Sequence, residues 1–222
     1  MNVILFGATG MIGQGVLREC LLDPRVQNVT VIGRNKTGQQ HPKLREIVHK
    51  DLWNYPSLED QLKGLDACFF CLGVASAGMK EDAYRRITRD IPAAAAETLA
   101  RLNPGMVFVF VSGRGTDNTG KSPLMWARIK GEAENAVLAQ PFKAAYMFRP
   151  GIIQPLHGIQ SRTRLYRIFY ILAAPLFPVI NALFPKSVTT TERIGQAMIN
   201  AVVRGAPMVF LENADINKLA GP

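Results

Sequence analysis

The sequence predicts an α/β protein built on a doubly wound parallel sheet. Over residues 1–150, strand-like apolar runs alternate with segments of helical spacing, the pattern of parallel strands joined by crossover helices. The chain has 222 residues, 48% of them hydrophobic, which suffices for one sizeable core and argues against disorder. We therefore expect a single domain over residues 1–222, with its core in residues 1–150 and a small helical, substrate-side region in residues 151–222.

The chain opens on a strand, a glycine turn and a helix, in the segment NVILFGATGMIGQG. The apolar run of residues 3–6 suits a strand buried on both faces. Gly7, Gly10 and Gly13 follow as G-x-x-G-x-x-G. The first permits a tight turn, the second lets a pyrophosphate approach the backbone, and the third lets the helix pack close to the sheet. Because the helix start would face the diphosphate, the motif predicts a Rossmann-like dinucleotide site; the alternative is a tight turn without a ligand.

The second predicted strand, residues 28–32, bears on which dinucleotide is bound. At the end of this strand the fold meets the adenosine ribose, where an acidic residue binds a free 2′-hydroxyl and an arginine suits a 2′-phosphate. Arg34 follows the strand, and residues 28–44 contain no Asp or Glu. The sequence therefore favours NADP over NAD; the alternative is that Arg34 is an exposed loop arginine.

The third and fourth predicted strands end near the expected adenine pocket. Residues 44–50 form the third strand, and Asp51 and Leu52 follow it. The carboxylate of Asp51 either accepts from the exocyclic amine or belongs to a strand-end turn. Residues 66–72 form the fourth strand, which Gly73 ends before a loop of small residues that lets the cofactor pass close to the backbone.

The remaining predicted elements complete the alternation. They are a short helix over 57–62 capped by Ser57, a helical region over 80–102 that Pro92 bends or interrupts, a strand over 106–111, a helix over 123–138 with Trp126 and Lys130 on one face, a strand over 144–148, a capped amphipathic helix over 189–204 and a short strand over 208–211. The apolar segment 168–184 is shorter than the ~20 residues of a spanning helix. We expect it to form a pocket lid or core rather than a membrane-surface anchor.

Charge and cysteine content restrict the partners and the compartment. The formal charge of +9 comes from scattered Lys and Arg, which argues against nucleic-acid binding and suits an anionic ligand such as NADP. Cys68 and Cys71 have C-x-x-C spacing, but strand residues three apart face opposite sides, so we expect structural thiols and no metal site. Reduced thiols and the lack of a signal peptide favour a cytoplasmic protein that binds a small-molecule substrate. The oligomeric state stays open.

Seven motifs give the chain a likeness to a known superfamily. They are GATGMIG at 7–13, GRN at 33–35, DL at 51–52, CLG at 71–73, VSGRG at 111–115, WARIKGEAE at 126–134 and FRPGII at 148–153. Over nearly its full length the chain resembles the short-chain dehydrogenase/reductase superfamily, most of all the atypical branch with the Tat-interacting-protein oxidoreductases and epimerase-like NAD(P)-binding proteins. The residues expected to hold the cofactor are Gly7, Thr9, Gly10, Met11, Ile12, Gly13, Arg34, Asp51, Leu52, Leu72, Gly73, Lys130, Pro150, Gly151 and Ile152.

The resemblance implies hydride transfer at the nicotinamide, with Lys130 and Ser112 as catalytic residues. In the family a tyrosine exchanges a proton, a lysine four residues later lowers the tyrosine pKa and binds the nicotinamide ribose, and a serine polarises the carbonyl. Lys130 matches the lysine, and Ser112 is a candidate for the serine, although many relatives have a second serine where this chain has Gly113. Trp126 occupies the tyrosine position, and an indole N–H cannot act as a general acid or base.

Two functions are consistent with these features. The first is an NADP-dependent oxidoreductase with an altered proton donor, acting on a carbonyl, quinone or enone. The second is a non-catalytic NADP-binding protein that senses redox state or scaffolds a partner. A third function, a membrane-peripheral role for the apolar segment 168–184, is less favoured. Tyr84, Tyr146, Tyr166 and His157 are further candidate donors, but none lies at a diagnostic spacing and each suits a structural role.

Overall fold

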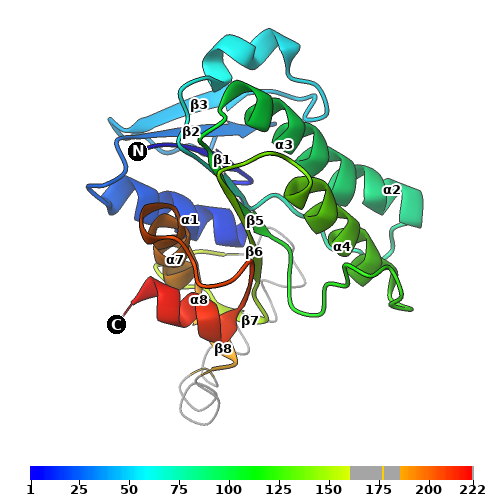
Figure 1. Ribbon diagram of the computed structural model, residues 1–222. Helices are drawn as coiled ribbons and strands as arrows, with labels where there is room; N and C mark the ends of the chain where they lie inside the picture. Colours follow the sequence, from blue (N-terminus) through cyan, green and yellow to red (C-terminus); the bar gives the residue numbers. More distant parts are fainter. Residues whose placement is uncertain (161–176, 178–185, 222) are drawn as a thin grey trace.

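A computed structural model of the chain describes residues 1–160, 177 and 186–221, and its centre is a seven-stranded sheet (Figure 1). The strand order is β3-β2-β1-β4-β5-β6-β9, and all neighbouring strands are parallel. The strands are β1 Asn2–Phe6, β2 Asn28–Gly33, β3 Leu44–Val48, β4 Ala67–Phe70, β5 Val107–Val111, β6 Ala144–Arg149 and β9 Phe210–Glu212. The order reverses between β1 and β4, and such sheets bind ligands outside the carboxyl ends of their strands at that point.

Helices cover both faces of the sheet (Figure 1). One face carries α1 Met11–Leu22, α7 Thr191–Arg204 and α8 Asn213–Ala220. The other carries η1 Pro56–Leu62, α2 Glu81–Arg85, the π-helical turn η2 Arg86–Asp90, α3 Ile91–Leu102 and α4 Met125–Leu138. A separate pair of parallel strands consists of β7 Ile152–Gln154 and β8 Val188–Thr190. The predicted α/β fold with a doubly wound parallel sheet is confirmed.

The central strands are buried on both faces, as expected of a parallel sheet. Along β1, Val3 packs in a cluster with α1 and α7, whereas Ile4 packs in a second cluster with η1 and α3. Cys68 belongs to the second cluster and Cys71 packs against the first, so the two thiols face opposite sides, as predicted. Burial raises the pKa of both thiols, which keeps them protonated.

The helix starts differ in part from the predicted ones. The helix η1 begins at Pro56 and has no side-chain cap, so the prediction of Ser57 as its cap is wrong; proline at a first helical position has no N–H to satisfy. Pro92 lies in the first turn of α3, directly after the π-helical turn η2, because proline cannot donate the backbone bond of a regular helix. The amphipathic helix predicted over 189–204 is capped, but it begins two residues later, at Thr191, because residues 188–190 form β8. Its cap is Thr190, whose hydroxyl accepts from the Arg193 N–H at 3.0 Å.

The predicted apolar segment 168–184 and Tyr166 lie outside the described residues, except for Phe177, which is buried. Among the helices that the structure describes, none has the length and apolar character needed to cross a membrane. The expected pocket lid and the less favoured membrane-surface contact stay predictions.

Candidate functional site

The glycine turn between β1 and α1 is packed too closely for side chains. Gly7 has a φ of 79°, and a Cβ built on it would lie 2.5 Å from the Leu72 nitrogen. A Cβ on Gly13 would lie 2.1 Å from the Gly7 carbonyl oxygen. The same oxygen accepts the Gly10 N–H at 2.9 Å. The turn therefore needs glycine at its first and third motif positions, and it brings the start of α1 against the end of β4.

The amino terminus of α1 presents backbone N–H groups to an anion. Gly10 precedes the helix in an extended conformation and offers no side chain as a cap, and the first turn contains no acidic residue. The first N–H groups of a helix have no carbonyl partner within it, and the helix dipole adds positive charge there. Thr9, Met11 and Ile12 are half-buried around this turn. These residues fit a diphosphate, which would accept the bonds that the helix leaves open.

The residues predicted for the adenosine half follow the ends of β2, β3 and β4. Arg34 is exposed directly after β2, and Leu72 and Gly73 follow β4. Asp51 is exposed, and its Oδ1 accepts the Trp53 N–H at 3.2 Å, as in a strand-end turn. Leu52 is buried in the core. Because the strands are parallel, these segments meet at the edge of the sheet that also carries the glycine turn.

The predicted residues after β6 lie on the other side of the reversal in strand order. Pro150 is buried, and its carbonyl accepts the Arg114 N–H at 3.0 Å. The Gly151 N–H donates to Asn213 Oδ1 at 2.9 Å. Ile152 begins β7 and is exposed. This segment is therefore held from both sides, by the loop after β5 and by the first residue of α8.

Lys130 lies on α4 against the loop that follows β5. Its Nζ donates to the Ser112 carbonyl oxygen. A Cβ added to Gly113 would lie 3.4 Å from this Nζ and 4.0 Å from the Pro150 oxygen. Burial lowers the pKa of Lys130 to about 8, and the nearby Glu134 opposes this by favouring the charged amine. The amine thus lies between the ends of β5 and β6, beside a residue without a side chain.

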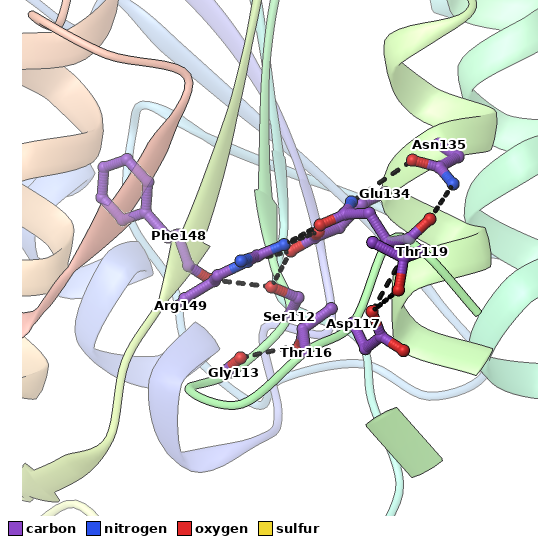
Figure 2. A network of polar contacts seen from close by, with 10 residues as sticks. Ser112, Gly113, Thr116, Asp117, Thr119, Glu134, Asn135, Phe148 and Arg149 are labelled. Carbon is purple, nitrogen blue, oxygen red and sulfur yellow. Dashed lines mark hydrogen bonds and ion pairs between the residues drawn. The ribbon is translucent and has the colours of Figure 1, made fainter. Parts of the chain in front are cut away.

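A buried carboxylate joins β5, α4 and β6 (Figure 2). Glu134 is fully buried and accepts from Ser112 Oγ at 2.5 Å and from Asn118 Nδ2 at 2.7 Å. Arg149 adds a donor at 2.9 Å from Nε and another at 2.5 Å from Nη2. Its guanidinium carbon also lies 4.4 Å from the ring centroid of Phe210. The bonds to Glu134 raise the pKa of Arg149, so the pair is an ion pair that ties both strand ends to α4.

This network restricts the predicted role of Ser112. Its hydroxyl donates to Glu134, with the Phe148 carbonyl 3.4 Å away, and both partners belong to the protein itself (Figure 2). Polarisation of a substrate carbonyl by Ser112 stays a prediction. Sequence reasoning did not identify Glu134 or Arg149, although Glu134 lies four residues after Lys130 in the motif WARIKGEAE, a spacing that places both on one helix face.

The aromatic side chains around the site are engaged in packing. Trp126 is half-buried, and a Cβ on Gly115 would lie 3.2 Å from its Cη2. Tyr84 is buried, and the Tyr146 hydroxyl accepts the Ala206 N–H at 3.2 Å. The remaining candidate donor in the described part of the chain, His157, pairs through Nε2 with Glu192 at 2.5 Å. Each of these candidates thus has a structural contact in the fold.

Comparison with known proteins identifies related chains. A family model described as NAD(P)H-binding matches residues 7–146. Protein fmp52, mitochondrial, of Emericella nidulans is 30% identical over 208 residues, which are 90% of this chain and 86% of that protein. Protein HTATIP2 of Rattus norvegicus is 30% identical over 155 residues, 68% of this chain, and this chain spans only 62% of its length. These relatives confirm the predicted resemblance to NAD(P)-binding Rossmann proteins.

Solved structures agree on the fold. The enzyme WbmF of Bordetella bronchiseptica, in complex with NAD+, matches with a TM-score of 0.68 at 15% identity, covering 98% of this chain and 76% of that one. At this identity the likeness concerns the fold alone. The name of the Emericella nidulans relative includes the word mitochondrial, so the expected cytoplasmic location stays a prediction.

Proposed function

The chain belongs to the NAD(P)H-binding family, and from this premise we propose that it is an NADP-dependent oxidoreductase that reduces a small carbonyl, quinone or enone. The glycine turn is the observation that carries the proposal: it combines a backbone that excludes side chains with uncapped N–H groups at a helix start. A reduced nicotinamide held there would supply hydride. Lys130 would bind its ribose, and the turn, Arg34 and the segments after β4 and β6 would hold the rest.

The preference for NADP rests on Arg34. This side chain is exposed where β2 ends, and its planar guanidinium matches a phosphate better than a hydroxyl. The stretch from residue 28 to residue 44 offers no carboxylate for a free ribose hydroxyl. The structural neighbour WbmF was solved with NAD+, which concerns that enzyme only.

Trp126 favours a second candidate function, a non-catalytic NADP-binding protein that senses redox state or supports a partner. The tryptophan occupies the position of the proton-donating tyrosine in the resembling family, and an indole N–H does not ionise in the useful range. Ser112 is committed to Glu134, so the hydroxyl expected to polarise a carbonyl has another partner.

Two measurements separate these candidates. Titration calorimetry with NADPH and with NADH tests binding, and we expect NADPH to bind more tightly; heat from neither nucleotide would refute both candidates. NADPH oxidation is then followed with menadione, benzaldehyde and cyclohexenone. Turnover with any of them supports the oxidoreductase, whereas bound NADPH with no turnover above background supports the non-catalytic protein.

A further inference from the structure

The position and contacts of Lys130 point to a role beyond holding the cofactor. We infer that Lys130 is the proton donor of this site, in the role that Trp126 cannot fill, and that Glu134 is its positioning residue. The inference rests on the proposed oxidoreductase function and names the residue that supplies the proton.

The first support is where the amine lies. Its Nζ donates to the Ser112 carbonyl oxygen at the end of β5, and a Cβ built on Gly113 would lie 3.4 Å from the nitrogen, so no side chain of residue 113 stands between the amine and the segment after β6. The residue as a whole is half-buried, and its amine lies far enough from water that burial lowers its pKa. Trp126 lies one turn earlier on the same face of α4 and packs over Gly115 instead. A donor at this position therefore comes from Lys130 and not from the indole.

The second support is the charge around the amine. Lys130 donates to a neutral carbonyl, whereas Glu134 on the same helix directs its oxygens to Ser112, Asn118 and Arg149. The negative charge of Glu134 is thus largely balanced by Arg149 from β6. From the loop after β5, Arg114 faces Glu212 at 3.8 Å. Burial lowers the pKa of Lys130 to about 8, and a general acid works best when its pKa lies near the working pH.

The step balances without a further reactant. The carbonyl carbon receives hydride, with its electron pair, from the reduced nucleotide. The carbonyl oxygen takes a proton as one N–H bond of the Lys130 ammonium breaks, which leaves a neutral amine and an alcohol. The amine then recovers a proton from water. In the reverse direction the neutral amine would accept the alcohol proton.

Glu134 positions this donor through the backbone and through its charge. Its bonds to Ser112 and Arg149 hold the loop after β5 to the end of β6, and the Ser112 carbonyl in that loop accepts from Lys130. Because the carboxylate also favours the charged amine, its loss lowers the pKa of Lys130. Loss of Glu134 should therefore move the titration of Lys130 as well as lower the stability of the chain.

Lys130→Arg tests the donor, since arginine keeps the positive charge for a ribose but does not release a proton near neutral pH. The matched control is Lys143→Arg, at an exposed lysine directly before β6. We expect Lys130→Arg to keep NADPH affinity in calorimetry and to lose at least about a hundredfold in benzaldehyde reduction, the lower bound for general acid catalysis. The control Lys143→Arg should keep both the NADPH affinity and the rate of benzaldehyde reduction. Reduction of benzaldehyde by Lys130→Arg at the wild-type rate would overturn the inference and leave the oxidoreductase intact, as would wild-type turnover of menadione or cyclohexenone without any of benzaldehyde. No turnover by the wild type with any of the three substrates would overturn both.

A titration without any substrate gives an independent readout. NMR of selectively labelled lysine in the free protein should show Lys130 titrating near the value of about 8, and below that in Glu134→Gln. The wild-type rate of benzaldehyde reduction should then fall as pH rises through the same value, because the charged amine is the acid. A Lys130 that titrates at the usual lysine pKa of about 10.4 would contradict the inference even if Glu134→Gln fails to fold.

Discussion

Replacing Glu134 by glutamine should destabilise the chain strongly, because it removes one partner of a buried ion pair. Glu134 is wholly buried, and the Arg149 side chain is 16% exposed. In Glu134→Gln the new amide N–H groups face the donors of Arg149 and Asn118, and the guanidinium loses its counter-charge. Breaking a buried pair in this way costs about 3–5 kcal/mol. The partial exposure of Arg149 and its contact with the Phe210 ring place the expected loss near the lower end, about 3 kcal/mol.

Urea unfolding followed by circular dichroism measures this loss, and a thermal scan should show Tm falling by about 6–12 °C, at about 2–4 °C per kcal/mol for a chain of this size. Arg149→Met and the double variant Glu134→Gln/Arg149→Met complete a mutant cycle. Since the double variant leaves no charge unpaired, its loss should fall short of the sum of the single losses by at least about 1 kcal/mol. Additive losses, or a Glu134→Gln cost under about 1 kcal/mol, would refute the proposed buried pair.

Three further predictions concern the cofactor turn, the cofactor choice and the loop after β5. Gly13→Ala should abolish NADPH binding in calorimetry, since its Cβ would lie 2.1 Å from a backbone oxygen, whereas Gly105→Ala, with no heavy atom within 4 Å, should bind normally. Arg34→Ala should weaken NADPH binding at least about tenfold and leave NADH binding nearly unchanged, because a charge-assisted hydrogen bond contributes about 1.5–3 kcal/mol. Lys36→Ala, at a neighbouring exposed lysine, is the control, and an equal loss of affinity for both nucleotides in Arg34→Ala would contradict the preference for NADP. Hydrogen bonds from Thr119 and Ser122 lower the pKa of Asp117 to about 2. The contribution of this carboxylate to stability should therefore be complete above about pH 4 and be lost as pH falls through 2. Urea unfolding of the wild type and of Asp117→Asn between about pH 5 and 2 would measure it.

Most of the sheet could be predicted because its strands are local features of the sequence. Apolar runs such as residues 3–6 and 107–111 suit a strand buried on both faces, and the glycine that follows the first run marks where that strand ends. The strands β7 and β8 were not predicted, because each has three residues and they pair with each other across a long stretch of chain. The helix α8 was also missed, although Glu212 and Asp215 form a capping box at its start, a signal that was present in the sequence.

The site divides in the same way. The glycine turn and Lys130 belong to short motifs of fixed spacing, so the sequence alone predicts them as parts of a candidate site. Glu134 pairs with Arg149 because α4 crosses the ends of β5 and β6, and the spacing of the two residues along the chain does not predict this contact. The commitment of the Ser112 hydroxyl to Glu134 follows from that crossing and was invisible for the same reason.

The buried ion pair is an indirect argument for a functional role of its surroundings. Apolar side chains of similar volume commonly stabilise an interior as well as an ion pair does, so holding β5 and β6 together does not by itself require a charge. What an apolar pair could not do is place a carboxylate one helical turn from Lys130 and fix the Ser112 carbonyl that accepts from that amine. The negative charge of Glu134 is therefore better explained by its effect on the position and pKa of Lys130 than by its contribution to stability. If Glu134 and Arg149 were replaced by apolar residues and the chain still folded, the pKa of Lys130 should change.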